Sequence, residues 1–171
     1  GSLFFAAARR ILPDLRYVAA AEAVLSCLQF HHGAWGHLVG RVFSDSCGDD
    51  FQAFLASIPR LDLFHIGMRC SPFSTADAST PLPQRRAKAA AALAELQAGL
   101  HFAASSPPSL LIIENVPTLL TPTWSSEWAA LRRILFSLSR YRWRLYVISP
   151  SRDLGFPSSR TRLWLAGSLA S

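Results

Sequence analysis

Lysine is nearly absent from this chain of 171 residues: Lys88 is the only one, whereas arginine occurs 16 times. No apolar run approaches the roughly 18 residues that a membrane-spanning helix needs, so we expect no membrane segment. Charged residues make up only 16% of the chain against 50% hydrophobic residues, which excludes an intrinsically disordered protein. We therefore expect one globular domain over residues 1–171.

Cysteine is also sparse, and its spacing excludes the common zinc and disulfide patterns. Cys27, Cys47 and Cys70 form no Cys-x-x-Cys pair, and the five histidines complete no zinc pattern, so we expect no metal. An odd, sparse set of cysteines indicates a reducing compartment. The first charges follow the first apolar run, the reverse of a secretory leader. We expect an intracellular protein, nuclear in a eukaryote and otherwise cytoplasmic.

The net charge of +6 comes almost entirely from arginine. The planar guanidinium group makes two hydrogen bonds at once to phosphate oxygens, so this excess favours a nucleic-acid partner. A compositional drift toward arginine and alanine explains the charge equally well.

Strand-like and helix-like segments alternate along the chain. Strands are expected at residues 16–23, 38–43, 61–67, 110–113, 142–149 and 160–167, and helices at 4–11, 23–32, 49–58, 84–104 and 125–141. Asp49 or Asp50 is expected to cap one helix, and Ser125 or Ser126 another. This alternation predicts an α/β fold with a doubly wound, mostly parallel sheet, in which ligands bind beyond the carboxyl ends of the strands.

Three segments at those strand ends carry reactive side chains. Cys70 follows one strand beside Arg69, and a thiol on a loop near a guanidinium is suited to nucleophilic attack. Glu114 leaves a buried strand, where a partly desolvated carboxyl is suited to donate a proton. Arg160 and Arg162 stand two apart, so in a strand both would share one face. Alone, each has a plainer reading: an idle cysteine, a turn cap and a solvated strand end.

Together these segments resemble the signatures of the cytosine-C5 methyltransferases. The segment CSPFS is similar to the family's Pro-Cys-Gln-Pro-Phe-Ser loop, with Cys70, Pro72, Phe73 and Ser74 in place. Glu114, Asn115 and Val116 are identical to its Glu-Asn-Val signature, and GFPSSRTR is similar to its Gly-x-Pro-Gln-x-Arg-x-Arg element. The order and the spacings, 44 residues from Cys70 to Glu114 and 48 more to Arg162, also fit.

Weaker similarities extend over most of the chain and concern the cofactor. The resemblance implies S-adenosylmethionine as methyl donor, with Gly1 and Ser2 similar to the end of the family's glycine-rich cofactor loop. Glu22 resembles the acidic residue that binds the ribose hydroxyls, and Asp49, beside Asp50, resembles the aspartate that receives the adenine amino group.

The resemblance further implies transfer of a methyl group to C5 of cytosine in DNA. Cytosine would be flipped out of the stack, Cys70 would add to C6, and Glu114 would bond N3 and the exocyclic amine. Arg162, with Arg160, would hold the base and the cysteine loop. The residues expected to form the substrate loop are Arg69, Ser71, Pro72, Phe73, Ser74, Asn115 and Val116.

Two departures from the family pattern lie beside the nucleophile. Arg69 stands where the family has a proline that stiffens the loop, and Ser71 stands where it has a glutamine. Methylation of cytosine in tRNA, and a catalytically silent module that binds nucleic acid, therefore stay open as alternatives. A cysteine hydrolase using Cys70 with His65 or His101 is disfavoured, because no glycine-flanked nucleophile turn surrounds the cysteine.

The ends of the chain also bear on the expected fold. In the family a first strand and most of the glycine loop precede the position of Gly1, and a recognition segment and a returning helix follow the last element seen here. We therefore expect a partial, monomeric catalytic core that lacks the first strand, binds the cofactor weakly and lacks sequence-specific activity alone.

Overall fold

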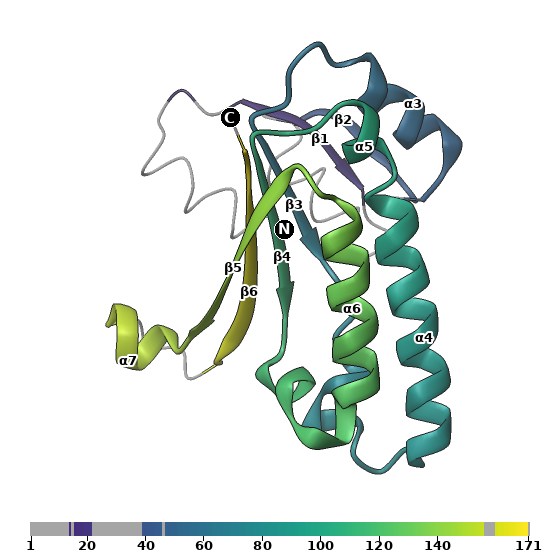
Figure 1. Cartoon of the computed structure of the whole chain (residues 1–171), viewed down its shortest axis with the longest axis vertical. Coiled ribbons are helices and arrows are strands. Elements are labelled where there is room, and N and C mark those ends of the chain that lie inside the picture. Colours follow the sequence, from purple (N-terminus) through teal and green to yellow (C-terminus); the bar gives the residue numbers. More distant parts are fainter. Residues whose placement is uncertain (1–13, 15, 22–38, 46, 156–159, 171) are drawn as a thin grey trace. The chain divides into compact units, whose positions relative to one another are not determined.

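Two sheets organise the computed structural model, which describes residues 14, 16–21, 39–45, 47–155 and 160–170 (Figure 1). The chain divides into two compact units, residues 1–58 and 59–171. The helices expected at residues 4–11 and 23–32 lie outside the described residues. The α/β class is confirmed, and the strand positions agree closely with those expected from the sequence.

The first unit contains a two-stranded parallel sheet and one helix. Strand β1 (Tyr17–Ala21) pairs with β2 (Val39–Phe43), and α3 (Asp49–Ser57) follows. Phe51 and Leu55, four residues apart on α3, are buried, and the ring of Phe51 packs edge-on against Phe43 at 5.1 Å between centroids. This spacing places both apolar side chains on one side of the helix.

The expected aspartate cap of α3 is wrong. The N-cap residue is Gly48, and Asp49 and Asp50 occupy the first turn. Acidic side chains in that turn still stabilise the helix, because they lie near the positive end of its dipole.

The second unit has a four-stranded sheet in the order β3-β4-β6-β5. The strands are β3 (Leu63–Gly67), β4 (Leu110–Asn115), β5 (Tyr141–Ile148) and β6 (Arg162–Leu169). Strands β3 and β4 are parallel, whereas β6 runs antiparallel to both β4 and β5. The sheet of this unit is therefore mixed, because β6 turns back beside β5 and enters the sheet between β4 and β5.

Helices α4 (Leu82–Gly99) and α6 (Ser125–Ser137) lie side by side along one face of this sheet (Figure 1). Alternation along β4 and β6 turns Leu111, Ile113, Leu163 and Leu165 toward the helices, and all four are at most 2% exposed. The buried residues of α4 follow the three-and-four spacing of an amphipathic helix; they are Ala89, Ala92, Leu93, Leu96 and Gly99.

Several helix ends differ from the expected ones. The long helix starts at Leu82 and ends at Gly99, and a separate short helix, α5 (Phe102–Ser105), turns Phe102 onto the ring of Phe64 in β3. The expected serine cap of α6 is wrong: buried Trp124 occupies the N-cap, because a 3-10 turn (Pro122–Trp124) runs directly into the helix.

Helix α6 ends at Ser137, because Tyr141 already belongs to β5. The buried hydroxyl of Tyr141 donates a hydrogen bond of 2.7 Å to the carbonyl oxygen of Pro108, and burial raises its pKa to about 12. A short helix, α7 (Pro150–Leu154), follows β5 and ends at Gly155, whose φ of 68° lies in the left-handed region that favours glycine.

Candidate active site

Cys70 lies on the loop that leaves the carboxyl end of β3. It is half-buried with a free thiol, and it forms the N-cap of a short 3-10 helix (Ser71–Phe73). Its carbonyl oxygen accepts hydrogen bonds of 3.0 Å from the amide groups of both Phe73 and Ser74. The position of the thiol is therefore coupled to the backbone of the three or four residues that follow it.

The residues after Cys70 anchor this loop in the second unit. Ser71 is exposed, whereas Pro72 and Phe73 are buried, and the ring of Phe73 packs edge-on against Trp124 at 5.1 Å between centroids. The hydroxyl of Ser74 accepts a hydrogen bond of 3.2 Å from the amide of Ala76 and begins the next 3-10 turn. The apolar residues Pro72 and Phe73 thus anchor the loop in the core, whereas Cys70 stays half-buried.

Arg69, the residue before Cys70, forms an ion pair with Glu95 of α4. Its Nη2 atom lies 2.7 Å from Oε1 of Glu95, and the two side chains are 54% and 45% exposed. An ion pair this exposed contributes little to stability, about 0–1 kcal/mol. The guanidinium of Arg69, which the sequence predicts to lie beside the thiol, therefore pairs with the carboxylate of Glu95.

Glu114 and Asn115 connect the end of β4 to the cysteine loop. The amide of Met68, two residues before Cys70, donates a hydrogen bond of 3.2 Å to the carbonyl oxygen of Glu114. Asn115 is 2% exposed; its Nδ2 atom donates to the carbonyl oxygen of Met68 at 3.4 Å, and its Oδ1 atom accepts from the amide of Val116 at 2.8 Å. Asn115 therefore ties the two loops together at one edge of the sheet.

Arg162 pairs with Glu114 across β4 and β6. The Nε atom of Arg162 lies 2.8 Å from Oε1 of Glu114, and the side chains are 17% and 29% exposed. In the strand register Glu114 faces Trp164, which makes Arg162 its diagonal neighbour on the same face of the sheet. Within the described residues Glu114 has no other side-chain partner, so its Oε2 atom is available to a ligand.

Not all of the predicted site residues are brought together. Arg160 is exposed and precedes β6, which begins at Arg162, so the expectation that both arginines lie within the last strand is wrong. Gly1, Ser2 and Glu22 lie outside the described residues. Asp49 and Asp50 are exposed in the first turn of α3, in the other of the two units.

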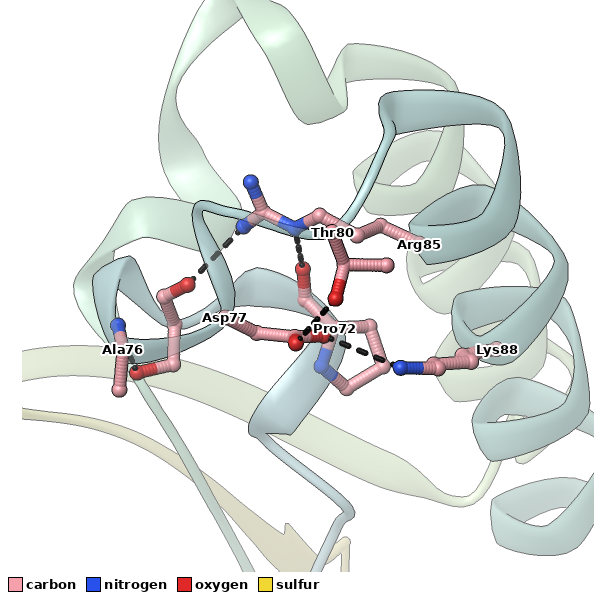
Figure 2. A network of polar contacts seen from close by, with 7 residues as sticks. Pro72, Ala76, Asp77, Thr80, Arg85 and Lys88 are labelled. Carbon is pink, nitrogen blue, oxygen red and sulfur yellow. Dashed lines mark hydrogen bonds and ion pairs between the residues drawn. The ribbon is translucent and has the colours of Figure 1, made fainter.

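Two residues that no sequence motif indicated also contact the cysteine loop. Arg85, near the start of α4, donates to the carbonyl oxygens of Pro72 and Ser74 (Figure 2), and the hydroxyl of Thr118 donates to that of Phe73. Neither is close in sequence to Cys70. In the sequence, Arg85 looks like an ordinary surface residue of an alanine-rich helix. Its contact with the cysteine loop is seen only in the structure.

Within the part of the chain that the structure describes, no group of three or more His, Cys, Asp or Glu side chains is arranged to hold a metal ion. The described helices include none whose length and apolar character would let it cross a membrane.

Comparison with known proteins gives the same family as the motifs. Residues 3–171 match the sequence model of the C-5 cytosine-specific DNA methylases. The type II methyltransferase M.NlaX of Neisseria lactamica is 27% identical over 165 residues, which cover 91% of this chain and 45% of that protein. The chain thus spans about half the length of the curated relative that it matches.

Two solved structures share the fold. One is a prophage-encoded E. coli protein described as a DNA modification methyltransferase, with a TM-score of 0.64, 17% identity and coverage of 89% of this chain and 40% of that one. The other is the S. pombe Dnmt2 methyltransferase, with a TM-score of 0.59, 19% identity and coverage of 90% and 42%. Because the family match extends over nearly every residue, this chain belongs to the C-5 cytosine-specific DNA methylase family.

Proposed function

We propose that the protein containing this chain transfers a methyl group to C5 of cytosine in DNA, with Cys70 as nucleophile. The observation that carries the proposal is the meeting of three motifs at one sheet edge: Met68 bonds the backbone of Glu114, and Arg162 bonds its carboxylate. Three segments separated by more than 40 residues each thus lie at the ends of neighbouring strands, as one shared site requires.

Each of the three residues has a separate task in the proposed reaction. The thiolate of Cys70 adds to C6 of a flipped cytosine while Glu114 bonds N3, which draws the electrons of the C5–C6 double bond onto C5. C5 takes the methyl group, and loss of the C5 proton restores the double bond and expels Cys70 as thiolate. Arg162 holds the Glu114 carboxyl through Oε1, so that Oε2 faces the base.

The methyl donor that the family implies is S-adenosylmethionine, which supplies an activated methyl group. We propose that Asp49, with its carboxylate exposed at the start of α3, accepts a hydrogen bond from the adenine amino group. Gly1, Ser2, Glu22 and Asp50 complete the proposed cofactor-binding set. We further propose that the protein works as a monomer on one catalytic domain with the doubly wound sheet that the family fold implies.

The proposed substrate loop comprises Arg69, Ser71, Pro72, Phe73, Ser74, Asn115 and Val116, with Arg160 beside the base or its phosphate. The excess of arginine favours a nucleic-acid substrate, and the family favours DNA over RNA.

Trapping of the covalent intermediate tests this proposal. Full-length protein is incubated with S-adenosylmethionine and a duplex containing 5-fluorocytosine, whose C5 fluorine cannot leave as a proton does, and denaturation-resistant adducts are counted on a gel. Wild-type protein and the Cys47→Ala variant are expected to form the adduct, whereas Cys70→Ala is expected to form none. Glu114→Gln, which keeps the side-chain shape but cannot donate a proton, should slow adduct formation by about 10²–10⁴-fold.

An adduct that persists in Cys70→Ala would assign the chemistry to another residue and refute the proposal. The same experiment with 5-fluorocytosine in tRNA tests the alternative substrate. An adduct with tRNA but not with DNA would show that the substrate is RNA and not DNA. Absence of any adduct in the wild-type protein, with retained DNA binding, would favour the silent binding module.

A further inference from the structure

Three successive carbonyl groups after Cys70 each accept a hydrogen bond from a side chain. Arg85 donates from Nε to the carbonyl oxygen of Pro72 at 2.8 Å and from Nη2 to that of Ser74 at 3.0 Å (Figure 2). Thr118, which follows β4, donates to the carbonyl oxygen of Phe73 between them. The backbone of residues 72–74 is therefore held from both sides, by α4 and by the loop after β4.

We call these three hydrogen bonds, from Arg85 and Thr118 to the carbonyl groups of residues 72–74, the clamp. The clamp is coupled directly to the position of the Cys70 thiol. The amide groups of Phe73 and Ser74 both donate to the carbonyl oxygen of Cys70, at 3.0 Å each. A displacement of residues 72–74 would stretch these two hydrogen bonds, so the conformation of Cys70 depends on the side chain of Arg85. The planar fork of a guanidinium can reach two carbonyl groups at once, whereas a lysine ammonium is a single point donor.

Arg85 is itself fixed by its surroundings. Its guanidinium lies 5.1 Å from the centre of the ring of Trp124, which is 3% exposed and packs edge-on against Phe73. Contact with an aromatic face stabilises a guanidinium and limits its rotamers. The two hydrogen bonds therefore come from a side chain that is ordered before any substrate binds.

A second set of contacts stabilises the segment that connects the cysteine loop to α4. The carboxylate of Asp77 accepts from the hydroxyl of Thr80 at 2.6 Å and from Nζ of Lys88 at 3.3 Å (Figure 2). The hydrogen bond from Thr80 holds the pKa of Asp77 below its usual range. Asp77 thus links the turn after Ser74 to the same first turns of α4 that carry Arg85.

The clamp also restrains a loop that lacks the stiffening proline found before the cysteine in the family motif. In this chain the position is Arg69, whose half-exposed ion pair with Glu95 contributes little rigidity. On the other side of Cys70, the contacts of Arg85 are part-buried and bidentate, which makes them the stronger restraint on the loop.

We propose that Arg85 is a positioning residue for the methyl-transfer reaction, one that holds the Cys70 loop in the conformation from which the thiol reaches C6. This inference rests on the proposed function. Arg85 touches neither the base nor the cofactor in the proposal; it acts through the carbonyl groups of Pro72 and Ser74.

The test compares Arg85→Lys and Arg85→Ala with the matched control Arg86→Ala in the full-length protein. Arg86 is the next residue on α4, but it contacts the carbonyl oxygen of Thr123 and the carboxylate of Glu127 and not the cysteine loop. We measure the single-turnover rate of adduct formation on 5-fluorocytosine DNA, the affinities for DNA and S-adenosylhomocysteine, and the midpoint of thermal unfolding.

Both Arg85 variants are expected to slow adduct formation by about 10²-fold, the loss expected for a misplaced reacting group, with both affinities within about twofold of wild type. Arg85→Lys, which keeps the charge but not the fork, should not rescue the rate. Arg86→Ala should form the adduct at the wild-type rate. Hydrogen exchange at the amides of Phe73 and Ser74 should accelerate in Arg85→Ala and not in Arg86→Ala.

Two results would overturn the inference: wild-type adduct rates in Arg85→Ala, or a loss in Arg85→Lys that is matched by lost cofactor affinity and a lowered unfolding midpoint. The latter would make Arg85 a residue of general stability only. Failure of the wild-type protein to form any adduct would instead overturn the proposed function. The two failures are therefore distinguishable.

Discussion

His65 is a half-buried titratable residue on β3, the strand that leads to the Cys70 loop. It lies opposite Ile112 in the register of β3 and β4, and its ring is 6.0 Å from that of Trp164. Burial lowers its pKa from 6.5 to about 4. The folded protein therefore keeps this imidazole neutral at pH values where the unfolded chain is already protonated.

The pKa shift predicts acid sensitivity within a defined window. Between pH 6.5 and about 4 the unfolded state binds a proton that the folded state excludes, so the free energy of unfolding falls as the pH falls. Above pH 6.5 both states are neutral and the group adds no pH dependence. The full loss across the window is about 3 kcal/mol, an upper figure for this single group.

Urea unfolding at pH 7, 5.5 and 4.5 measures this effect. His65→Gln, which cannot be protonated, should flatten the decline relative to wild type, whereas His101→Gln, at an exposed position, should retain it. An equally steep decline in His65→Gln would show that other groups cause the acid sensitivity.

Glu114 and Arg162 show how a single pair of residues can serve two purposes. Their ion pair spans β4 and β6 and leaves both side chains less than one-third exposed. A partly buried charge with no partner is costly, so removal of either side chain is expected to affect the sheet as well as the proposed chemistry. For this reason the shape-preserving Glu114→Gln is a better probe of function than a truncation to alanine.

Gly167 on β6 is required by the packing of the edge strand β5. It lies directly opposite Trp143, and a Cβ atom at this position would be 2.8 Å from two atoms of the indole ring. The ring cannot move freely, because its Nε1 atom donates to the carbonyl oxygen of Leu135 on α6 at 3.0 Å. The glycine thus allows Trp143 to connect the sheet edge to the helix.

Gly167→Ala is therefore expected to destabilise the protein by about 1–3 kcal/mol, through overpacking and the displaced hydrogen bond. The measurement is the urea midpoint. Gly67→Ala is the matched control, because no atom lies within 4 Å of the position of its added Cβ. The double variant Gly167→Ala/Trp143→Leu should lose less than the sum of the two single variants, whereas strict additivity would contradict the steric explanation.

The elements were largely predictable from the sequence, and the reason lies in their patterns. The run of apolar residues in β4 and the three-and-four spacing of α4 specify these elements locally. The antiparallel direction of β6 is not specified in this way, because period-two alternation is the same in either direction. The caps at Gly48 and Trp124 were also missed, since both depend on the preceding turn rather than on the residue type.

The residues of the candidate site were likewise predictable only where a sequence pattern contains them. Cys70, Glu114 and Arg162 were identified because the family's motifs contain them, and the Glu114–Arg162 ion pair agrees with their expected proximity. Arg85 and Thr118 were not identified, because their contribution is to donate to carbonyl groups of a distant loop. Hydrogen bonds to backbone carbonyl groups leave no sequence pattern at the acceptor, so only coordinates reveal them.

At the scale of the whole molecule, the proposed functional residues separate by unit. All the proposed cofactor-binding residues belong to residues 1–58, and Cys70, Glu114 and Arg162 belong to residues 59–171. The two ligands of the proposed reaction are therefore expected to stabilise different parts of the chain. Amide hydrogen exchange detects such differences, because exchange slows where a ligand binds the folded form.

S-adenosylhomocysteine added to the full-length protein should slow exchange in α3, which begins with Asp49, by up to about 10²-fold at 100 times its dissociation constant. A duplex containing 5-fluorocytosine should instead slow exchange in residues 70–74, through which the thiol is held. Asp49→Ala should lose the first effect and retain the second, and Cys70→Ala should reduce only the second. Protection of residues 70–74 by S-adenosylhomocysteine alone, with α3 unchanged, would contradict the assignment of Asp49. A ligand slows exchange in those segments whose opening releases it, so this result would show that donor binding depends on the second unit and not on α3.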